Sequence, residues 1–216
     1  MFCFTDHKRG AVECLFVLLA VCLFSHGEIA QAQEKFSDID RVLAIAFEHA
    51  RNYPPDFISE AQRDDVEGLL RDALDQLERM LKNNGPSREV LFRLGKASLF
   101  AYNLDIPGSR QKADEYFGQL FRLEPDDAEG HLYYGQHLSG RGDFEAALTH
   151  LQIAAEGGQE IALNMIGLTF LQMGQPDEAK KYFEELLKKH PGDPQLRMLL
   201  DSLSPDGEYE YKLMKE

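Results

Sequence analysis

Residues 163–191 read LNMIGLTFLQMGQPDEAKKYFEELLKKHP, and this stretch decides the fold. Its first half places three apolar side chains and one glycine at the i, i+3, i+4 and i+7 positions of one helix face. These residues are Leu163, Ile166, Gly167 and Phe170. A turn through Gly174 follows, and Pro176 suits the first position of a second helix, whose acidic start complements the helix dipole. The stretch therefore predicts two helices joined by a tight turn.

The same pattern occurs twice more upstream. The first-helix quartet recurs as Leu91, Leu94, Gly95 and Ser98, and as His131, Tyr134, Gly135 and Leu138. The second helix carries Ala179, Phe183, Leu186 and Pro191, and this set recurs as Ala113, Phe117, Leu120 and Pro125, and as Ala147, Leu151 and Ala154. In each copy a small residue permits close crossing of two helices, and larger residues fill the space between them. Because strand-like clusters with a period of two are missing, we predict an all-α fold with about three repeated helix pairs.

These residues resemble the tetratricopeptide repeat (TPR), a helix-turn-helix unit of about 34 residues with a small residue in each helix. The resemblance covers residues 87–203 and implies an α-solenoid, a stack of helix pairs with a concave binding face. Six residues are inserted between Ser98 and Ala113, which predicts a longer turn over 103–111. The next period is 32 residues, and residues 154–158 resemble the junction of the related Sel1-like repeat.

The first 32 residues have the order of a secretory signal peptide: bases, then the apolar run 14–24, then a short segment that ends in AQA. We predict cleavage after Ala32, with cleavage after Gly27 or retention as an anchor as the alternatives. Eleven apolar residues reach only about half of the bilayer core, which disfavours a lasting transmembrane anchor. All three cysteines lie in this segment, so the mature chain would hold no disulfide. We therefore expect export, to a bacterial periplasm or alternatively as a secreted protein.

Helical patterns also flank the repeats. Upstream, we predict one helix that begins after Ser37 as its N-cap and ends before Pro54, and a second helix over 64–82. Downstream, residues 194–203 are expected to form a capping helix, as the end of a solenoid requires. The predicted organisation is a signal peptide over 1–32, an N-terminal helical cap or degenerate repeat over 33–86, a TPR-like repeat domain over 87–203 and a tail over 204–216.

The balance of charge restricts the class of partner. The chain of 216 residues has 23 Lys and Arg against 37 Asp and Glu, a formal charge of −14. Such a chain lacks the bases that neutralise nucleic-acid phosphates or coat an anionic bilayer. We therefore expect a protein or peptide partner, and neither nucleic acid nor a membrane surface.

No pattern in the sequence points to catalysis. The sequence contains no His-Glu-x-x-His zinc motif, no Gly-x-Ser-x-Gly nucleophile and no phosphate-binding loop. His131 and His137 are six residues apart, about 240° around a helix, so they cannot share a metal ion. We predict a non-enzymatic protein-interaction scaffold without catalytic residues, metal or cofactor. The alternatives are an accessory or catalytic cell-envelope protein whose activity lies in the N-terminal helices, and a permanently assembled structural subunit.

The resemblance to TPR proteins places a peptide segment or partner helix in the concave groove, which is lined by the first helix of each pair. The candidate groove residues are Phe92, Arg93, Lys96, Leu99, Leu132, Tyr133, Gln136, Asn164, Leu168 and Leu171. For Phe92, Leu132 and Leu168, the alternative is packing between adjacent repeats. The carboxylate clamp that some family members use is not expected, because Lys96 has no basic counterpart at Asn164 or Leu168.

Overall fold

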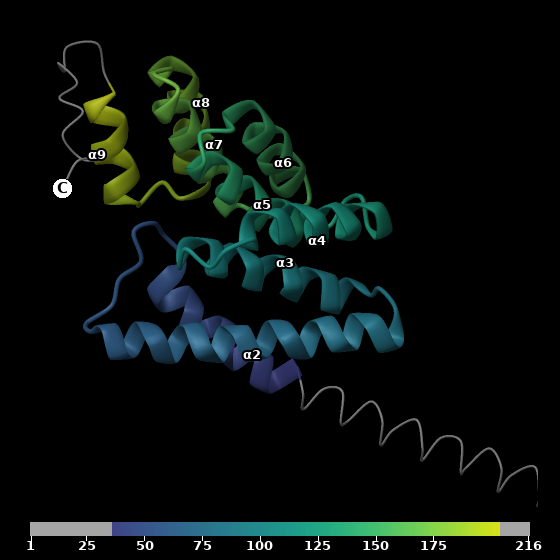
Figure 1. The fold of residues 1–216 in the computed structure, drawn as a ribbon. Coiled ribbons are helices and arrows are strands. Elements are labelled where there is room, and N and C mark those ends of the chain that lie inside the picture. The colour runs from purple at the N-terminus through teal and green to yellow at the C-terminus, as the bar shows by residue number, and fades with distance from the viewer. Residues whose placement is uncertain (1–35, 204–216) are drawn as a thin grey trace, which may run out of the picture.

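The computed structural model describes residues 36–203, so the predicted signal peptide and the tail lie outside the described residues. Within 36–203 the chain is helical and has no strand (Figure 1). A helical segment over residues 36–50 is followed by α2 (Glu60–Asn84), α3 (Arg88–Asn103), α4 (Ser109–Leu123), α5 (Ala128–Gly140), α6 (Phe144–Glu156), α7 (Ile161–Gln172), α8 (Pro176–Lys189) and α9 (Pro194–Ser202). In this part of the chain, no helix combines the length and the apolar character that crossing a membrane requires.

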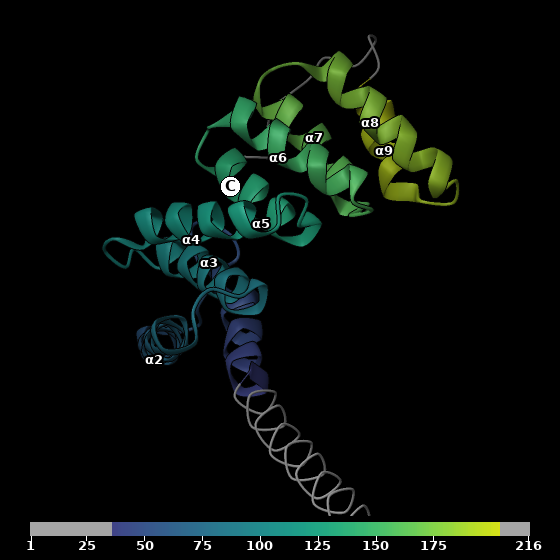
Figure 2. The same cartoon turned by 90° about the vertical axis from the view of Figure 1, so that its right-hand side faces the viewer.

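The helices pack as consecutive pairs. α3 packs against α4, α5 against α6 and α7 against α8, and each pair contacts the next pair along the chain. The pairs stack in one direction from α2 to α9 (Figure 1 and Figure 2). At the C-terminal end α9 covers α8. The prediction of an all-α solenoid with a C-terminal capping helix is confirmed.

A glycine in the first helix of each pair lies against a large side chain of the second helix. The three contacts are Gly95 with Phe117, Gly135 with Leu151 and Gly167 with Phe183. A Cβ atom added to these glycines would lie 2.7, 2.8 and 2.5 Å from the opposing side chain, closer than real Cβ atoms come. The predicted small residues of the second helices, Ala113, Ala147 and Ala179, are fully buried. Because glycine has no side chain and alanine has only a methyl group, the two helices of each pair can approach closely.

The six-residue insertion lengthens α3 as well as its turn. α3 has 16 residues, against 13 in α5 and 12 in α7. The prediction of a loop over 103–111 is wrong at both ends, because the turn takes only residues 104–108. The buried side chains of Phe100 and Ala101 extend the apolar face of α3, and Leu104 is buried at its end. This apolar face favours one more helical turn over a loop.

The extended end of α3 holds the N-terminal helices. The side-chain amide Nδ2 of Asn103 donates to the carbonyl oxygen of Ala50 at 2.7 Å. Nη2 of Arg63, in α2, donates to the carbonyl oxygen of Leu104 at 3.1 Å. Both bonds satisfy carbonyl groups at helix ends that have no partner within their own helix. The inserted residues therefore join α2 and the segment 36–50 to the repeats.

Two predicted helix starts are wrong. Ser37 lies inside the first helical segment rather than at its N-cap, and α2 begins at Glu60 rather than at Asp64. The Oγ atom of Ser59 caps α2, because it accepts a hydrogen bond from the backbone N–H of Gln62 at 3.2 Å. Ser59 and Gln62 have the spacing of a capping box, but they precede the apolar stripe of α2. Periodicity alone therefore places the start of the helix too late.

Buried apolar side chains form one large cluster and two smaller ones. The large cluster runs from Ile39 to Leu120 and joins the segment 36–50 to α2, α3 and α4. One smaller cluster joins α6 to α7, and the other joins α7, α8 and α9. The N-terminal helices thus share a core with the first repeat.

We expect Gly167→Ala to lower the free energy of unfolding by about 1–3 kcal/mol, because the new Cβ atom overlaps the Phe183 ring. This loss should outweigh the gain of about 1 kcal/mol that alanine brings to a helix. Gly68→Ala in α2 is the control, since no atom lies within 4 Å of its added Cβ. Thermal unfolding followed by circular dichroism should show a lower midpoint for the first variant and a higher one for the second. An unchanged midpoint in Gly167→Ala would contradict the close packing.

Candidate protein-binding groove

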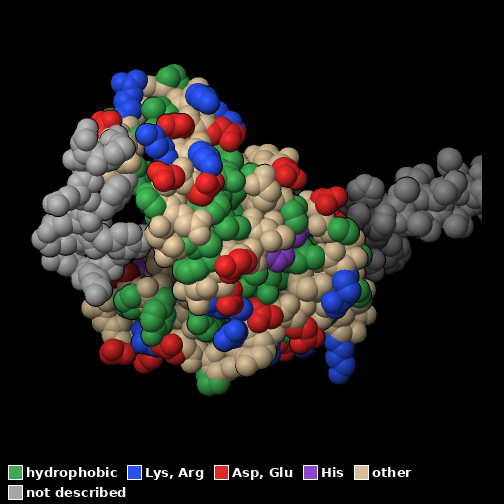
Figure 3. Space-filling view, turned by 90° about the horizontal axis from the view of Figure 1, so that it is seen from above, with side chains coloured by type: hydrophobic (Ala, Val, Ile, Leu, Met, Phe, Trp, Pro, Cys, Tyr) green, Lys and Arg blue, Asp and Glu red, His purple; other side chains and the backbone are tan. Residues whose placement is uncertain are grey.

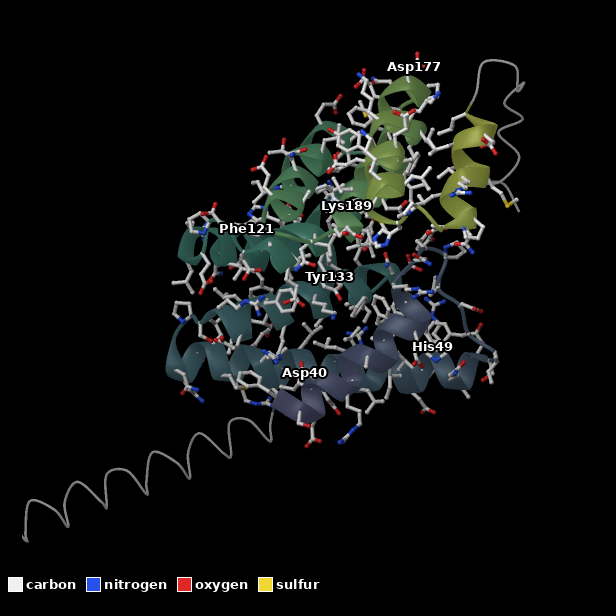
Figure 4. All side chains as sticks on the ribbon, turned by 180° about the vertical axis from the view of Figure 1, so that it is seen from behind. Asp40, His49, Phe121, Tyr133, Asp177 and Lys189 are labelled. Carbon is white, nitrogen blue, oxygen red and sulfur yellow. The ribbon has the colours of Figure 1, made fainter. Side chains whose placement is uncertain are left out.

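The first helices of successive pairs border a hollow of about 470 Å³. The segment 36–50 contributes Asp40, Leu43, Ala44, Phe47 and Glu48, α3 contributes Arg88, Phe92, Arg93 and Lys96, and α5 contributes Glu129 and Tyr133. Figure 4 labels Asp40 and Tyr133, which border the hollow from different helices. We call this set of eleven residues the aromatic groove.

Aromatic rings from three helices surround one lysine of the aromatic groove. The Nζ atom of Lys96 lies 4.4 Å from the ring centroid of Tyr133, and 5.9 Å from those of Phe47 and Phe92. The Phe92 and Tyr133 rings meet edge to face, with their centroids 5.7 Å apart. Lys96 therefore receives cation–π stabilisation from several sides, and its aliphatic stem crosses an apolar surface.

Arg93 joins α3 to the segment 36–50. Its Nε and Nη2 atoms donate to the two carboxylate oxygens of Asp40 at 2.7 and 2.8 Å. Its guanidinium carbon lies 4.3 Å from the centroid of the Phe36 ring. A bidentate pair of this kind fixes orientation as well as distance. The charge of Arg93 is therefore already balanced within the chain.

Arg88 joins α3 to α5. Its Nε donates to Asp127 at 2.7 Å, and its Nη2 donates to Glu129 at 2.8 Å. Burial disfavours the charged guanidinium, but hydrogen bonds to the two carboxylates outweigh burial and raise the pKa of Arg88. The Oδ1 atom of Asp127 also accepts from the backbone N–H of Gly130 at 2.6 Å and so caps α5. Asp127 thus fixes both the arginine and the start of the next first helix.

The structure brings part of the predicted groove set together and separates the rest. Phe92, Arg93, Lys96 and Tyr133 border the aromatic groove, although Phe92 is only 6% exposed and also belongs to the large core. The others lie elsewhere: Leu99 is buried in the large core, Leu132 packs on the core between α6 and α7, Leu168 and Leu171 pack on the core of α7 to α9, and Gln136 and Asn164 are half-buried. The described groove therefore lies toward the N-terminal end of the solenoid.

The contribution of the segment 36–50 to the lining of the aromatic groove was not predicted from the sequence. The predicted set was drawn from three repeats only, so it omitted Asp40 and Phe47. A signal was present, because Phe47 lies in the first helix predicted upstream of the repeats, and a degenerate repeat was one of the two predictions for this helix pair. The first helix of a degenerate repeat should line the same face as the first helices of the other repeats.

The described residues contain no group of three or more His, Cys, Asp and Glu side chains that could hold a metal ion. Two of the three carboxylates of the aromatic groove, those of Asp40 and Glu129, instead pair with arginines. The chemistry of the groove is therefore that of apolar contact, cation–π contact and hydrogen bonding.

Comparisons with known proteins identify the repeats. Two tetratricopeptide repeat family models match residues 108–160 and 160–200. The prediction of tetratricopeptide repeats is therefore confirmed over 108–200. The Sel1-like character of residues 154–158 stays a prediction.

Solved structures show the same fold. MamA is 21% identical, with a TM-score of 0.54 over 68% of this chain and 84% of that one. A thermophilic TPR protein of Thermus thermophilus is 21% identical, with a TM-score of 0.53 over 66% and 76% of the two chains. PilF of Pseudomonas aeruginosa is 19% identical, with a TM-score of 0.51 over 79% and 69%.

A curated relative shares only part of its length with this chain. The probable biofilm formation methyltransferase WspC of Pseudomonas aeruginosa is 34% identical over 90 residues, which are 42% of this chain and 20% of WspC. The match thus spans about a fifth of that protein. The name methyltransferase refers to WspC as a whole and not to the matched part.

We expect Asp127→Ala to lower the free energy of unfolding by about 2 kcal/mol, because it removes the N-cap of α5 and leaves Arg88 without its buried partner. Asp127→Asn keeps a capping oxygen and removes the charge, so its loss should be smaller. Urea unfolding of the two variants measures both changes. Equal losses in the two variants would show that the cap contributes nothing.

Proposed function

We propose that this chain is a non-catalytic interaction module that binds a peptide segment or a partner helix in the aromatic groove. Tetratricopeptide repeats generally mediate protein–protein interactions. The observation that carries the proposal is the convergence of Phe47, Phe92 and Tyr133, from three helices, around Lys96. Phe92 is itself buried, so Phe47 and Tyr133, which are half-buried, would supply the aromatic contact area, at low cost in conformational entropy.

The charges of the aromatic groove favour a segment of mixed character. Three acids and three bases line it, although the whole chain carries −14. Arg88 and Arg93 already pair with carboxylates, whereas Lys96 forms no ion pair among the described residues. Acidic and basic side chains are likewise interspersed with apolar ones on the face seen in Figure 3. A balanced groove suits an apolar segment with a few polar groups better than a polyanion or a polycation.

We also propose that residues 1–32 direct export and that the protein acts in a bacterial periplasm. The support is the order of bases, apolar run and small residues, together with the confinement of all cysteines to this segment. Export would place the aromatic groove among envelope proteins.

Intact-mass analysis of the protein purified from its own cells should show a mature chain that begins at Gln33, because cleavage after Ala32 removes the small-residue motif. A chain beginning at Glu28 would support export with the alternative site. A mature protein that retains residue 1 would contradict cleavage.

Substitution in the aromatic groove should weaken partner binding. We expect Tyr133→Ser to reduce the amount of crosslinked partner about fivefold or more, because truncating an aromatic anchor at an interface costs about 1–3 kcal/mol. The measurement is crosslinking in the native envelope followed by quantitative mass spectrometry. Retention should also survive moderate salt, because screening weakens exposed charge pairs more than apolar contact.

The matched control is Tyr53→Ser, since Tyr53 is 66% exposed and lies outside the groove lining. It should leave partner retention unchanged. The proposal fails if retention collapses with salt and does not respond to Tyr133→Ser. That result would assign binding to the acidic outer surface instead.

A further inference from the structure

Two histidines face each other where α4, α5 and α6 meet. The Nδ1 atoms of His131 in α5 and His150 in α6 are 2.7 Å apart. Phe121 of α4, labelled in Figure 4, stacks on His131 with a centroid distance of 4.0 Å and lies 5.2 Å from His150. His131 is only 3% exposed. The three rings therefore connect the pair α3/α4 to the pair α5/α6.

The hydrogen-bond partners fix which nitrogen of each ring carries hydrogen. Nε2 of His131 lies 2.8 Å from the carbonyl oxygen of Pro125. A carbonyl oxygen only accepts, so this nitrogen must donate. Neutral His131 then has an unprotonated Nδ1, and the hydrogen between the two rings must belong to Nδ1 of His150. His150 is left with a lone pair on Nε2, which has no hydrogen-bond partner among the described residues.

This arrangement limits the number of protons that the histidine pair can hold. A first proton adds to Nε2 of His150 and leaves the hydrogen bond between the rings intact. A second proton can add only to Nδ1 of His131, which is the accepting atom of that bond. Two N–H groups and two positive charges would then face each other at 2.7 Å, so the rings must separate.

The groups around the histidine pair do not supply a compensating charge at close range. They are Tyr134 and His137 of α5, Asp114 of α4, Arg141 and Asp143 of the turn before α6, and Glu145 of α6. Asp114 accepts hydrogen bonds from Tyr134 and Arg141, both at 2.9 Å. Its negative charge is therefore already paired with Arg141. Burial, and then the neighbouring His131, lower the pKa of His150 to about 4. The neutral pair is the state that the folded junction favours.

We propose that the His131–His150 pair is a proton-operated latch that holds α5 to α6 in the second repeat, at its contact with Phe121 of the first repeat. In its neutral form the latch holds α5 and α6 against Phe121 of α4. When acid adds the second proton, the latch opens and this junction loosens. The latch does not depend on the proposed function, but Glu129 and Tyr133 lie on the same helix as His131, so its opening moves one wall of the aromatic groove.

The first test is the position of the hydrogens. Long-range proton–nitrogen NMR spectra of the full folded protein at about pH 7.5 should show hydrogen on Nε2 of His131 and on Nδ1 of His150. Hydrogen on Nδ1 of His131, or a charged His150 at this pH, would overturn the latch. This measurement needs no variant.

The second test is the dependence of thermal stability on pH. The folded state lowers the pKa of His150, so the unfolded chain takes up a proton at this residue first and stability falls as pH drops from about 6.5 toward about 4. We expect the wild-type midpoint to fall by about 5 °C or more between about pH 7 and pH 5. His150→Gln keeps a donor toward His131 and cannot be charged, so its fall should be smaller than that of the wild type.

Two control variants separate the latch from other titrating groups. His190→Gln changes an exposed histidine that pairs with Glu160, away from the junction, and should reproduce the wild-type fall. Burial, together with Arg141, lowers the pKa of His137 to about 4. His137→Gln therefore measures how much of the fall in thermal midpoint is due to His137. The latch is excluded if His150→Gln loses as much stability in acid as the wild type does. If His150→Gln fails to fold, the hydrogen positions in the wild-type protein decide the question.

Discussion

The close contact between a glycine and a large side chain within each helix pair is the constraint on which the structure depends. Gly95, Gly135 and Gly167 let Phe117, Leu151 and Phe183 reach the backbone of the partner helix. The same kind of close contact thus holds each pair, and such repeated pairs stack in one direction. The first helices consequently share one face of the stack. The aromatic groove exists because α3 and α5 are placed on that face by their own second helices.

The N-terminal helices turn this repeated pattern into a particular surface. Their docking uses the inserted turn of α3, through Asn103 and Leu104, and the ion pair of Arg93 with Asp40. A regular repeat without the insertion would lack the hydrogen bonds made through Asn103 and Leu104. The segment 36–50 brings Phe47 to Lys96, and α5 brings Tyr133 to the same amine. The insertion, which departs from the repeat pattern, therefore helps to assemble the candidate binding site.

Local patterns in the sequence predicted the helix pairs, their close contacts and the capping helix, because each depends on residues within one or two helical turns. Boundaries were less well predicted, since the cap at Ser59 lies outside the apolar stripe. The groove was half predicted: α3 and α5 were identified, but the contribution of Asp40 depends on how a distant helix docks. The His131–His150 contact was not predicted either. Two side chains that are 19 residues apart meet only for one register of α5 against α6. Periodicity fixes the face of a helix but not its longitudinal position against a neighbour.

The division of the apolar core has a consequence for cooperativity. The large cluster unites the segment 36–50 with α2, α3 and α4, whereas α6 to α9 rely on two small clusters. Long-range ion pairs are also more numerous before α6, where Arg93 pairs with Asp40, Lys112 with Glu78 and Arg88 with Asp127, whereas His190 pairs with Glu160 in the C-terminal part. Stability in a solenoid is a sum of local and nearest-neighbour contributions, so such unevenness separates its subglobal openings in free energy. The helices α6 to α9 would then unfold and refold locally while the part of the chain held by the large cluster stays folded. Within residues 36–203, the N-terminal part would be the more rigid and the C-terminal part the more easily opened.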